Sequence, residues 1–250
     1  MLKKLEELPL LSLLIPYDTL KWKGRYVDNG YLSNFSKIEQ PILYRGEEFH
    51  STECVYMASK NPLHLVNGVP LYKALHNATP SKAKFMVGRR SGTPLRENWD
   101  LMEVSAMAHA ICLKFHSESP ELRWLMSQPE HTLVEWTTWG DRRWGVSFKN
   151  HTDTIAKGCN ALGLLLILRK RGILKNVVNE DEWINYQPEL LKDMEKVSRE
   201  LFVTPTQQPD LLALSHAFDG DKELEEPSKR VTPVRIRHLN IVPRHKPITP

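Results

Sequence analysis

One short stretch of the chain, residues 49–60, spaces an acid, a phenol and an amine as the turns of a helix would. Glu53, Tyr56 and Lys60 stand at i, i+3 and i+7, so at 3.6 residues per turn their side chains share one helix face. A carboxylate and an amine on one face can support a developing cation, move a proton or attack a carbonyl carbon. We therefore take this stretch as the first candidate for a catalytic site.

Local signals define both ends of this helix. Ser51 or Thr52 can cap the start, because a hydroxyl there accepts a hydrogen bond from a backbone amide without a helical partner. Glu53 then lies in the first turn, where the helix dipole favours negative charge. Asn61 precedes Pro62, and the residue before proline is pushed out of the helical region. A solvated surface helix that carries these charges only for solubility remains the alternative.

Cations gather in a second segment, residues 82–90. Lys84 and Arg89 lie on either side of Gly88, and clustered cations beside a glycine could receive a phosphate. From spacing alone, a solvated basic helix face is the commoner arrangement.

A third segment, residues 139–145, is dense in side chains that are costly to expose. It contains Asp141, Trp144 and Gly145. Two tryptophans around an acid–arginine pair could form a wall against which a flat ring lies, with the carboxylate directed at it. A structural hairpin with a buried Asp–Arg bridge is the alternative.

The elements that must position these groups follow from hydrophobic periodicity and turn residues. Alternating apolar positions on both sides of Gly46 predict two short strands within residues 41–50. Thr79 and Pro80 predict the start of the second of two helices within residues 71–90. The other expected elements are a core helix over 99–115, a short helix over 122–126, a strand over 133–136, a buried helix over 162–168 capped by Asn160, and a helix over 190–201.

Length and composition favour one large domain. The chain has 250 residues, of which 41% are hydrophobic, enough to bury a core. No apolar run approaches the roughly 18 residues that a membrane span needs, and three widely spaced cysteines suggest a reducing compartment. The cytoplasm is therefore the expected location, and a membrane is not an expected partner.

Charge and composition divide the chain. Residues 1–175 hold 24 basic and 17 acidic residues, whereas 176–250 hold 10 and 13. A basic main domain suits phosphate-bearing ligands, but it equally suits ordinary solubility. We expect an extension at 1–29 that packs on the domain, a catalytic domain at 30–175, and an extension at 176–250 that is largely disordered beyond its one helix.

Several common signatures are absent from the sequence. It contains no P-loop, no Gly-x-Gly-x-x-Gly and no His-Glu-x-x-His, and its ten histidines lack zinc-ligand spacing. Neither a metal nor a bound cofactor is expected.

A series of short blocks between residues 30 and 173 resembles, in order and spacing, the NADAR or YbiA-like family. The blocks are Tyr31-Leu-Ser-Asn34-Phe35, Glu53-x-x-Tyr56-x-x-x-Lys60, Ala83-Lys84 with Gly88-Arg89, Arg96-x-x-Trp99-Asp100, Lys114-Phe115, Leu133-Val-Glu135, Asp141-Arg142-x-Trp144-Gly145 and Gly158-x-Asn160-x-Leu162-Gly163.

The resemblance implies a fold and an activity. The fold is a compact, mainly helical α+β domain with a small β-sheet. Family members are associated with NAD and ADP-ribose metabolism, and characterised relatives are N-glycosidases. Some cleave ribosylamino-pyrimidine phosphates of riboflavin biosynthesis, and others remove ADP-ribose from modified guanine. The expected partner is thus a nucleotide-like small molecule, or ADP-ribosylated nucleic acid.

The resemblance also implies residue roles. Glu53, Lys60 and Asp141 are the expected catalytic residues. Expected substrate-binding residues are Asn34, Phe35, Tyr56, Lys84, Arg89, Trp99, Trp144, Gly145 and Asn160. Among these, the two tryptophans would stack on the base and the two asparagines would hold ribose hydroxyls. Purely structural roles for these four remain the alternative, since Trp is commonly core and Asn commonly caps.

Cleavage of a ribose C1–N bond needs support for an oxocarbenium-like carbon and a proton for the departing nitrogen. Glu53 or Asp141 suits the first task. A desolvated Lys60 could attack C1 of the opened sugar and form a Schiff base, whereas a charged Lys60 would bind phosphate or donate the proton. Two rival classes remain, a module that binds ADP-ribose without turnover and a scaffold that acts through its tail.

The sequence departs from the family pattern at three places. Cys54 stands where histidine is usual, Glu103 stands where lysine is usual, and the spacing from Lys84 to Gly88 is one residue longer. One extra residue turns the following part of a helix by about 100°, which affects the expected phosphate contacts of Lys84 and Arg89.

Overall fold

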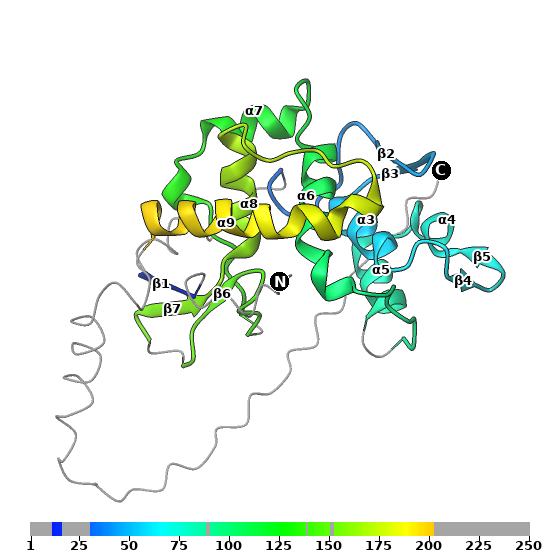
Figure 1. Cartoon of the computed structure of the whole chain (residues 1–250), viewed down its shortest axis with the longest axis horizontal. Coiled ribbons are helices and arrows are strands. Elements are labelled where there is room, and N and C mark those ends of the chain that lie inside the picture. Colours follow the sequence, from blue (N-terminus) through cyan, green and yellow to red (C-terminus); the bar gives the residue numbers. More distant parts are fainter. Residues whose placement is uncertain (1–11, 17–30, 89–90, 139, 151–152, 203–250) are drawn as a thin grey trace, which may run out of the picture. The chain divides into compact units, whose positions relative to one another are not determined.

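The computed structural model describes residues 12–16, 31–88, 91–138, 140–150 and 153–202. This part of the chain is mainly helical with short strands (Figure 1), which confirms the expected α+β fold class. The expectations for Arg89, for Trp139 and for the tail beyond residue 202 lie outside the described residues.

The helices and strands are short, apart from the last helix. The α-helices are α3 (Thr52–Ser59), α4 (Leu71–Leu75), α5 (Pro80–Val87), α6 (Glu103–Lys114), α7 (Pro120–Ser127), α8 (Ala161–Lys170) and α9 (Trp183–Leu201). The strands are β1 (Leu13–Pro16), β2 (Ile42–Tyr44), β3 (Glu47–Phe49), β4 (Leu65–Val66), β5 (Val69–Pro70), β6 (Val146–Ser147) and β7 (Ile155–Gly158). Single 3₁₀ turns cover Trp99–Leu101, Glu130–Thr132 and Glu180–Glu182.

A three-stranded antiparallel sheet joins the N-terminal segment to the middle of the chain. Its strand order is β1-β7-β6, with Leu13 opposite Gly158 and Pro16 opposite Ile155. Leu13 and Ile15 are fully buried, so β1 adds apolar side chains to the core as well as an edge strand. The segment before the expected domain boundary thus takes part in the sheet.

The strands expected around Gly46 form a β-hairpin. Ile42 pairs with Phe49 and Tyr44 with Glu47. The two turn residues, Arg45 and Gly46, both have positive φ, 51° and 79°, as a two-residue type I′ turn requires. The hairpin confirms the prediction, and it leads the chain directly into α3.

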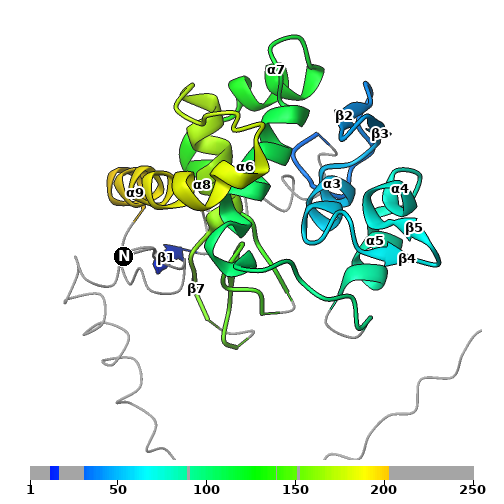
Figure 2. The same cartoon turned by 45° about the vertical axis from the view of Figure 1, so that its right-hand side comes forward.

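The helix predictions for residues 71–126 are also confirmed. Thr79 caps α5 by accepting the Lys82 amide, and Pro80 occupies the first turn of that helix. The long helix expected over 99–115 begins instead with a 3₁₀ turn and becomes α-helical at Glu103. Together with the β4–β5 hairpin, α4 and α5 form a group on the side away from the β1–β7 sheet (Figure 2).

The strand prediction for residues 133–136 was wrong. This segment is an irregular loop with one isolated bridge, between Trp136 and Val146. Two further backbone hydrogen bonds hold it, from Thr137 to Val146 and from Val146 to Glu135. Its apolar residues are buried because the loop packs into the core, so apolar sequence alone did not indicate a strand.

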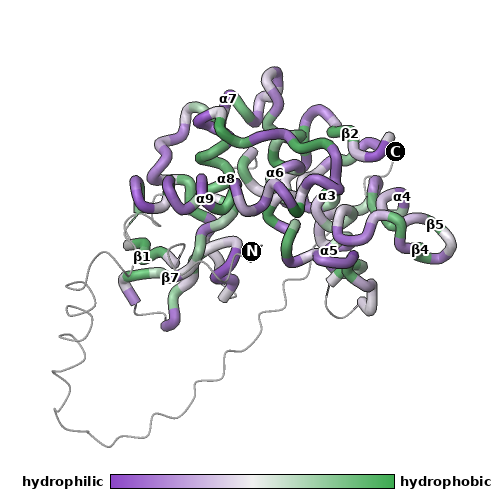
Figure 3. The backbone as a smooth tube through the Cα atoms, viewed as in Figure 1, coloured by the Kyte–Doolittle hydropathy of each residue, from purple (hydrophilic) through white to green (hydrophobic). Residues whose placement is uncertain are grey.

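The core is built around α6, α8 and α9. Every residue of α8 from Ala161 to Leu168 is buried. By contrast, α9 buries one side and exposes the other, and hydrophilic residues recur along its length in Figure 3. None of the helices in the described ranges is both long and apolar enough to cross a membrane.

The folded domain extends further toward the C-terminus than the predicted boundary at residue 175. The helix expected over 190–201 begins at Trp183, whose side chain is fully buried. Just before it, Glu180 accepts hydrogen bonds from Tyr44 (2.8 Å), Arg45 (2.8 Å) and Arg96 (2.7 Å). Residues 177–202 therefore belong to the folded domain, and a boundary at residue 175 would divide its core.

This packing predicts the effect of single substitutions in α9. Leu190→Ala removes a fully buried side chain and should lower the free energy of unfolding by about 2–5 kcal/mol. Lys192→Ala changes an exposed residue of the same helix and should stay within about 0.5 kcal/mol of the parent chain. Denaturant unfolding measures both. Equal stabilities for the two variants would show that α9 does not contribute to the core.

Candidate active site

The N-terminus of α3 is held by its own cap and by a neighbouring loop. Ser51 is the N-cap and its hydroxyl accepts the Cys54 amide at 3.3 Å. The Glu53 amide donates to the Asn34 carbonyl at 3.0 Å, so the loop at residues 31–39 fixes the first turn of the helix. The predicted cap is confirmed at Ser51, while the Thr52 side chain is buried.

Glu53 is a buried carboxylate beside two lysines. It is 5% exposed, and its Oε1 lies 3.8 Å from Lys84 Nζ. Burial raises the pKa of the Glu53 carboxyl, whereas the charges of Lys84 and Lys60 lower it. The carboxylate thus depends on these cations for its charge.

Tyr56 links Glu53 to Lys60 along the face of α3. Lys60 Nζ lies 5.1 Å from the centroid of the Tyr56 ring, within the range of a cation–π contact. Burial raises the pKa of the Tyr56 phenol, and the nearby Glu53 charge raises it further. The structure therefore brings the three residues of the Glu-x-x-Tyr-x-x-x-Lys pattern together on one side of the helix.

Phe35 and Lys84 cover the same region from the outside. Lys84 Nζ lies 5.1 Å from the Phe35 ring centroid, and both side chains keep exposed surface, 50% for Lys84 and 42% for Phe35. The Asn34 side chain is half-buried, with its amide 3.6 Å from the Met107 sulfur. We refer to Phe35, Glu53, Tyr56, Lys60 and Lys84 as the α3 site.

A buried cation supports the loop that carries Phe35. Lys114, at the end of α6, is 1% exposed, and its Nζ donates to the Ser33 carbonyl at 2.8 Å. Burial lowers the pKa of Lys114 to about 7, against the opposing charge of Glu121. Glu121 is buried too and accepts the Glu39 amide at 3.3 Å. Two buried ionisable side chains thus hold the two ends of this loop.

The segment after Gly140 is shaped by the carboxylate of Asp141. Its Oδ1 accepts the amides of Arg143 (3.0 Å) and Trp144 (3.1 Å). This turn directs the half-buried Trp144 ring to within 5.5 Å of the Tyr56 ring, edge to face. Asp141 also adds to the negative potential at Tyr56, so the structure brings Asp141 and Trp144 to the α3 site.

Three residues expected to bind substrate are buried and make structural contacts. Asn160 is fully buried, and its side-chain amide bridges the Leu133 carbonyl (3.1 Å) and the Glu135 amide (2.8 Å). It starts α8 in a left-handed conformation without capping it through the side chain, so the predicted side-chain cap was wrong.

Gly145 and Trp99 are the other two buried residues of this kind. Gly145 is buried, and a Cβ there would lie 2.4 Å from the Glu135 carbonyl oxygen, so glycine permits close packing of two loops. Trp99 is 6% exposed and packs 5.6 Å from the Tyr56 ring, which leaves little ring surface to stack on a base.

Sequence reasoning missed an ion pair beside the site. Arg143 pairs with Glu103, a buried residue at the start of α6, and its charge lowers the Tyr56 pKa against the effect of burial. Glu103 is the position where lysine is usual in the related pattern. An acid at that position was the available signal that a basic partner would lie opposite.

No group of three or more possible metal ligands occurs among the described residues. The α3 site instead offers one carboxylate, two amines, a phenol and aromatic surface. These groups can stabilise positive charge, transfer a proton and bind an anion.

The comparison with family models matches the NADAR domain over residues 21–173. The chain belongs to the NADAR domain family. A structure search also found the NMR structure of the E. coli protein YbiA, at 27% sequence identity and a TM-score of 0.42, covering 58% of this chain and 79% of that one. Nothing matched in the search of curated proteins.

Within this NADAR domain, the unusual Cys54 is accommodated by packing. Its thiol is buried and lies 3.2 Å from the Ala78 carbonyl, to which it donates. Burial raises the pKa of this thiol, which keeps it protonated. Cys54 therefore joins α3 to the chain before α5 and adds no second charge next to Glu53.

Lys114 gives a testable pH dependence of stability. Its folded-state pKa of about 7 lies below its ordinary value of 10.5, so between these values the unfolded chain binds more protons. The free energy of unfolding should therefore rise with pH across this window, by at most about 1.4 kcal/mol per pH unit. Lys114→Met should remove this contribution. Urea unfolding at pH 7 and 9.5 measures the difference.

The exposed Lys192→Met serves as the matched control for that experiment. It should keep the pH dependence of the parent chain. If Lys114→Met keeps it as well, the Lys114 ammonium is not desolvated in the folded state.

Proposed function

We propose that the chain is an N-glycosidase that hydrolyses a ribose C1–N bond in an ADP-ribose-related or nucleotide-related substrate. The single observation that carries this proposal is the buried Glu53 carboxylate with Lys60 and Lys84 near it on one side. Membership of the NADAR family supports the same class of chemistry. Candidate substrates are ADP-ribosylated guanine and a ribosylamino-pyrimidine phosphate.

The reaction needs two kinds of assistance, and the α3 site contains groups suited to both. The Glu53 carboxylate would stabilise positive charge at C1 as the C1–N bond weakens. Asp141 lies near enough to influence Tyr56 electrostatically and would reinforce that field. The departing nitrogen must gain one proton, which a charged Lys60 could supply in a route without a covalent intermediate.

A covalent route through Lys60 is the form of the mechanism that we prefer. A neutral Lys60 amine attacks C1, the C1–N bond to the base breaks, and the base leaves with a proton. The ring oxygen then leaves C1 and takes a proton, which gives an imine between Lys60 and the open sugar. Water adds to this imine and expels the amine, so the net reaction consumes one water and releases base and sugar.

The remaining residues would bind the substrate. The half-exposed Lys84 is suited to a phosphate, as a point charge beside Glu53. Phe35 and Trp144 keep accessible ring surface for a flat base, and Asn34 is available to a ribose hydroxyl. Under this proposal the family's nucleotide-like substrate would enter beside Lys84.

The rival is a module that binds ADP-ribose without turnover. Such a module needs the basic and aromatic groups but not the acid–amine pair. The observation that favours an enzyme is the burial of Glu53, because a carboxylate beside the site would repel a phosphate and is costly to desolvate.

Glu53→Gln and Lys60→Ala test the proposal. Each should reduce hydrolysis by about 100-fold or more, with ligand affinity changed far less. Incubation with ADP-ribosylated guanosine and, separately, with the ribosylamino-pyrimidine phosphate, followed by mass spectrometry of the released base, measures this. Glu189→Gln and Lys192→Ala on α9 are matched controls. Binding without any hydrolysis by the parent chain would favour the rival module.

Borohydride reduction during turnover adds an independent readout for the covalent route. It should trap a sugar adduct on Lys60 of the parent chain and none on Lys60→Ala. Turnover without an adduct would reject the imine intermediate. Direct hydrolysis assisted by the Glu53 carboxylate would then be the remaining route.

The pH profile tests the electrostatic role of Lys84. Lys84 lowers the pKa of Glu53, so Lys84→Met should raise that pKa. If the charged carboxylate is the active form, the acidic limb of the rate profile should move to higher pH in this variant. Lys192→Met should leave it in place. An unchanged acidic limb in Lys84→Met would show that the ionisation of Glu53 does not set the pH dependence of the rate.

A further inference from the structure

A carboxylate from outside the family match contacts the chain on both sides of α3. Glu180 lies beyond residue 173, where the match to the NADAR domain ends, and its side chain is 11% exposed. Its Oε1 accepts hydrogen bonds from the Tyr44 hydroxyl and from Arg45 Nε, both at 2.8 Å, and its Oε2 accepts one from Arg96 at 2.7 Å. One side chain thus joins a residue pair before α3 to an arginine after it.

Glu180 is charged, and its contacts are strong ones. Burial by itself would raise the pKa of the Glu180 carboxyl, but the hydrogen bonds from Arg45 and Tyr44 and the charge of Arg45 bring that pKa below its ordinary value. Hydrogen bonds between an arginine and a carboxylate are about twice as strong as neutral ones. The Arg96 guanidinium also lies 5.9 Å from the ring centroid of the fully buried Trp183. Arg96 is therefore fixed by two residues of the C-terminal segment.

On the N-terminal side, Glu180 fixes the hairpin that leads into α3. Tyr44 and Arg45 belong to the β2–β3 hairpin, and the buried Tyr44 ring packs 5.7 Å from the ring of Phe49, edge to face. Phe49 ends β3, two residues before the Ser51 cap of α3. The contacts of Glu180 with this hairpin thus reach the start of the helix.

On the C-terminal side, the backbone of Arg96 holds the residue that carries the candidate amine. Carbonyls at the end of a helix lack partners within it, and the Lys60 carbonyl accepts the Arg96 amide at 2.8 Å. The Asn61 side chain donates to the Pro94 carbonyl at 3.1 Å. The amide of Lys60 itself makes a longer bond, 3.4 Å, to the Met57 carbonyl. The segment 94–96 therefore fixes the last turn of α3, from which Lys60 projects.

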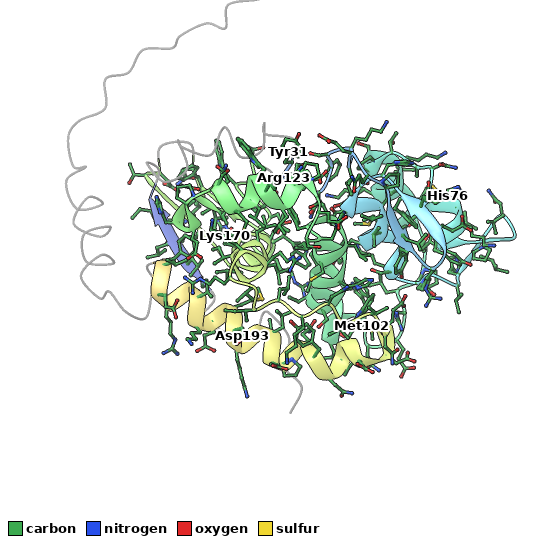
Figure 4. All side chains as sticks on the ribbon, turned by 90° about the horizontal axis from the view of Figure 1, so that it is seen from above. Tyr31, His76, Met102, Arg123, Lys170 and Asp193 are labelled. Atoms are coloured by element: carbon green, nitrogen blue, oxygen red, sulfur yellow. The ribbon has the colours of Figure 1, made fainter. Side chains whose placement is uncertain are left out.

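The first turns of α9 fix the chain that follows Arg96. The side chain of Gln187 accepts the Val104 amide at 2.9 Å and donates to the Asp100 carbonyl at 3.1 Å. Figure 4 shows Met102, between these two residues, beside α9. Arg96 is thus attached to a segment that is itself anchored on the C-terminal part of the domain.

We propose that Glu180 is a positioning residue for the α3 site, which holds Lys60 in place through Arg96. Its effect on rate rests on the proposed function, because Lys60 is the amine of that reaction. A displacement of about 1 Å at a reacting group can cost about 100-fold in rate. The hold on Lys60 can also be measured without any turnover.

Glu180→Gln and Arg96→Met break the same contact from its two sides. Each should lower kcat by about 10- to 100-fold with a smaller change in KM, and the double variant should cost no more than the larger single change, because both act through one contact. Glu130→Gln is the matched control. Its carboxylate also binds an arginine, Arg171, at 2.7 Å, and its loss should leave kcat unchanged.

A role in folding alone is distinguished by adding Lys60→Ala. If Glu180 acts through Lys60, Glu180→Gln should cause no further loss of rate in the Lys60→Ala chain. A loss by the same factor in both backgrounds would overturn the proposal and assign Glu180 a general structural role.

Amide hydrogen exchange, followed by NMR, tests the hold on Lys60 directly. The Arg96 amide should exchange about 10-fold faster in Glu180→Gln, and in Arg96→Met the amide of residue 96 should do the same, because it donates to the Lys60 carbonyl. The amide of Leu165 in α8 reports global unfolding and should change by a smaller factor. Equal factors at residues 96 and 165 would overturn the proposal.

The two readouts separate this inference from the proposed function. Faster exchange at residue 96 in a chain that hydrolyses neither candidate substrate would reject the proposed function and support the contact with Lys60. Hydrolysis by the parent chain with an unchanged kcat in both Glu180→Gln and Arg96→Met would overturn the positioning role and leave the proposed function in place.

Discussion

The structure of this NADAR domain depends on one costly arrangement, a carboxylate buried at the first turn of a helix. Glu53 loses most of its contact with water, and burial raises its pKa. Two lysines and the dipole of α3 offset that cost. Much of the surrounding architecture keeps these groups in place, since the 31–39 loop contacts the helix start and α5 brings Lys84 to the acid. A buried charge that needs this much support is more easily explained by function than by stability.

The supporting parts come from distant parts of the sequence. Lys114 on α6 holds the loop that accepts the Glu53 amide, and Asp141 shapes the turn that places Trp144 against Tyr56. Asn160 fixes the loop that packs against Gly145. Several residues of the family pattern therefore act one contact away from the α3 site. Their spacing in sequence reflects how the loops pack as well as what the site binds.

Sequence reasoning was most successful where local chemistry decides the structure. The Ser51 cap, the Gly46 hairpin and the start of α5 at Pro80 each depend on residues within one or two turns, and all three were predicted. It failed where a distant partner decides. The loop at 133–136 looked like a strand because its burial comes from tertiary packing. The burial of Lys114 and its contact with the Ser33 carbonyl, 81 residues away, had no local signal.

The Glu53 carboxyl is subject to two opposing effects, burial that raises its pKa and the charges of Lys84 and Lys60 that lower it. Carbon-13 NMR titration of the glutamate carboxyls, with Glu53→Gln to assign the signal, measures their balance directly. We predict a Glu53 pKa above the ordinary value of 4.5 and a further increase in Lys60→Met. A Glu53 signal that titrates at the ordinary value and does not respond to the loss of Lys60 would contradict this prediction.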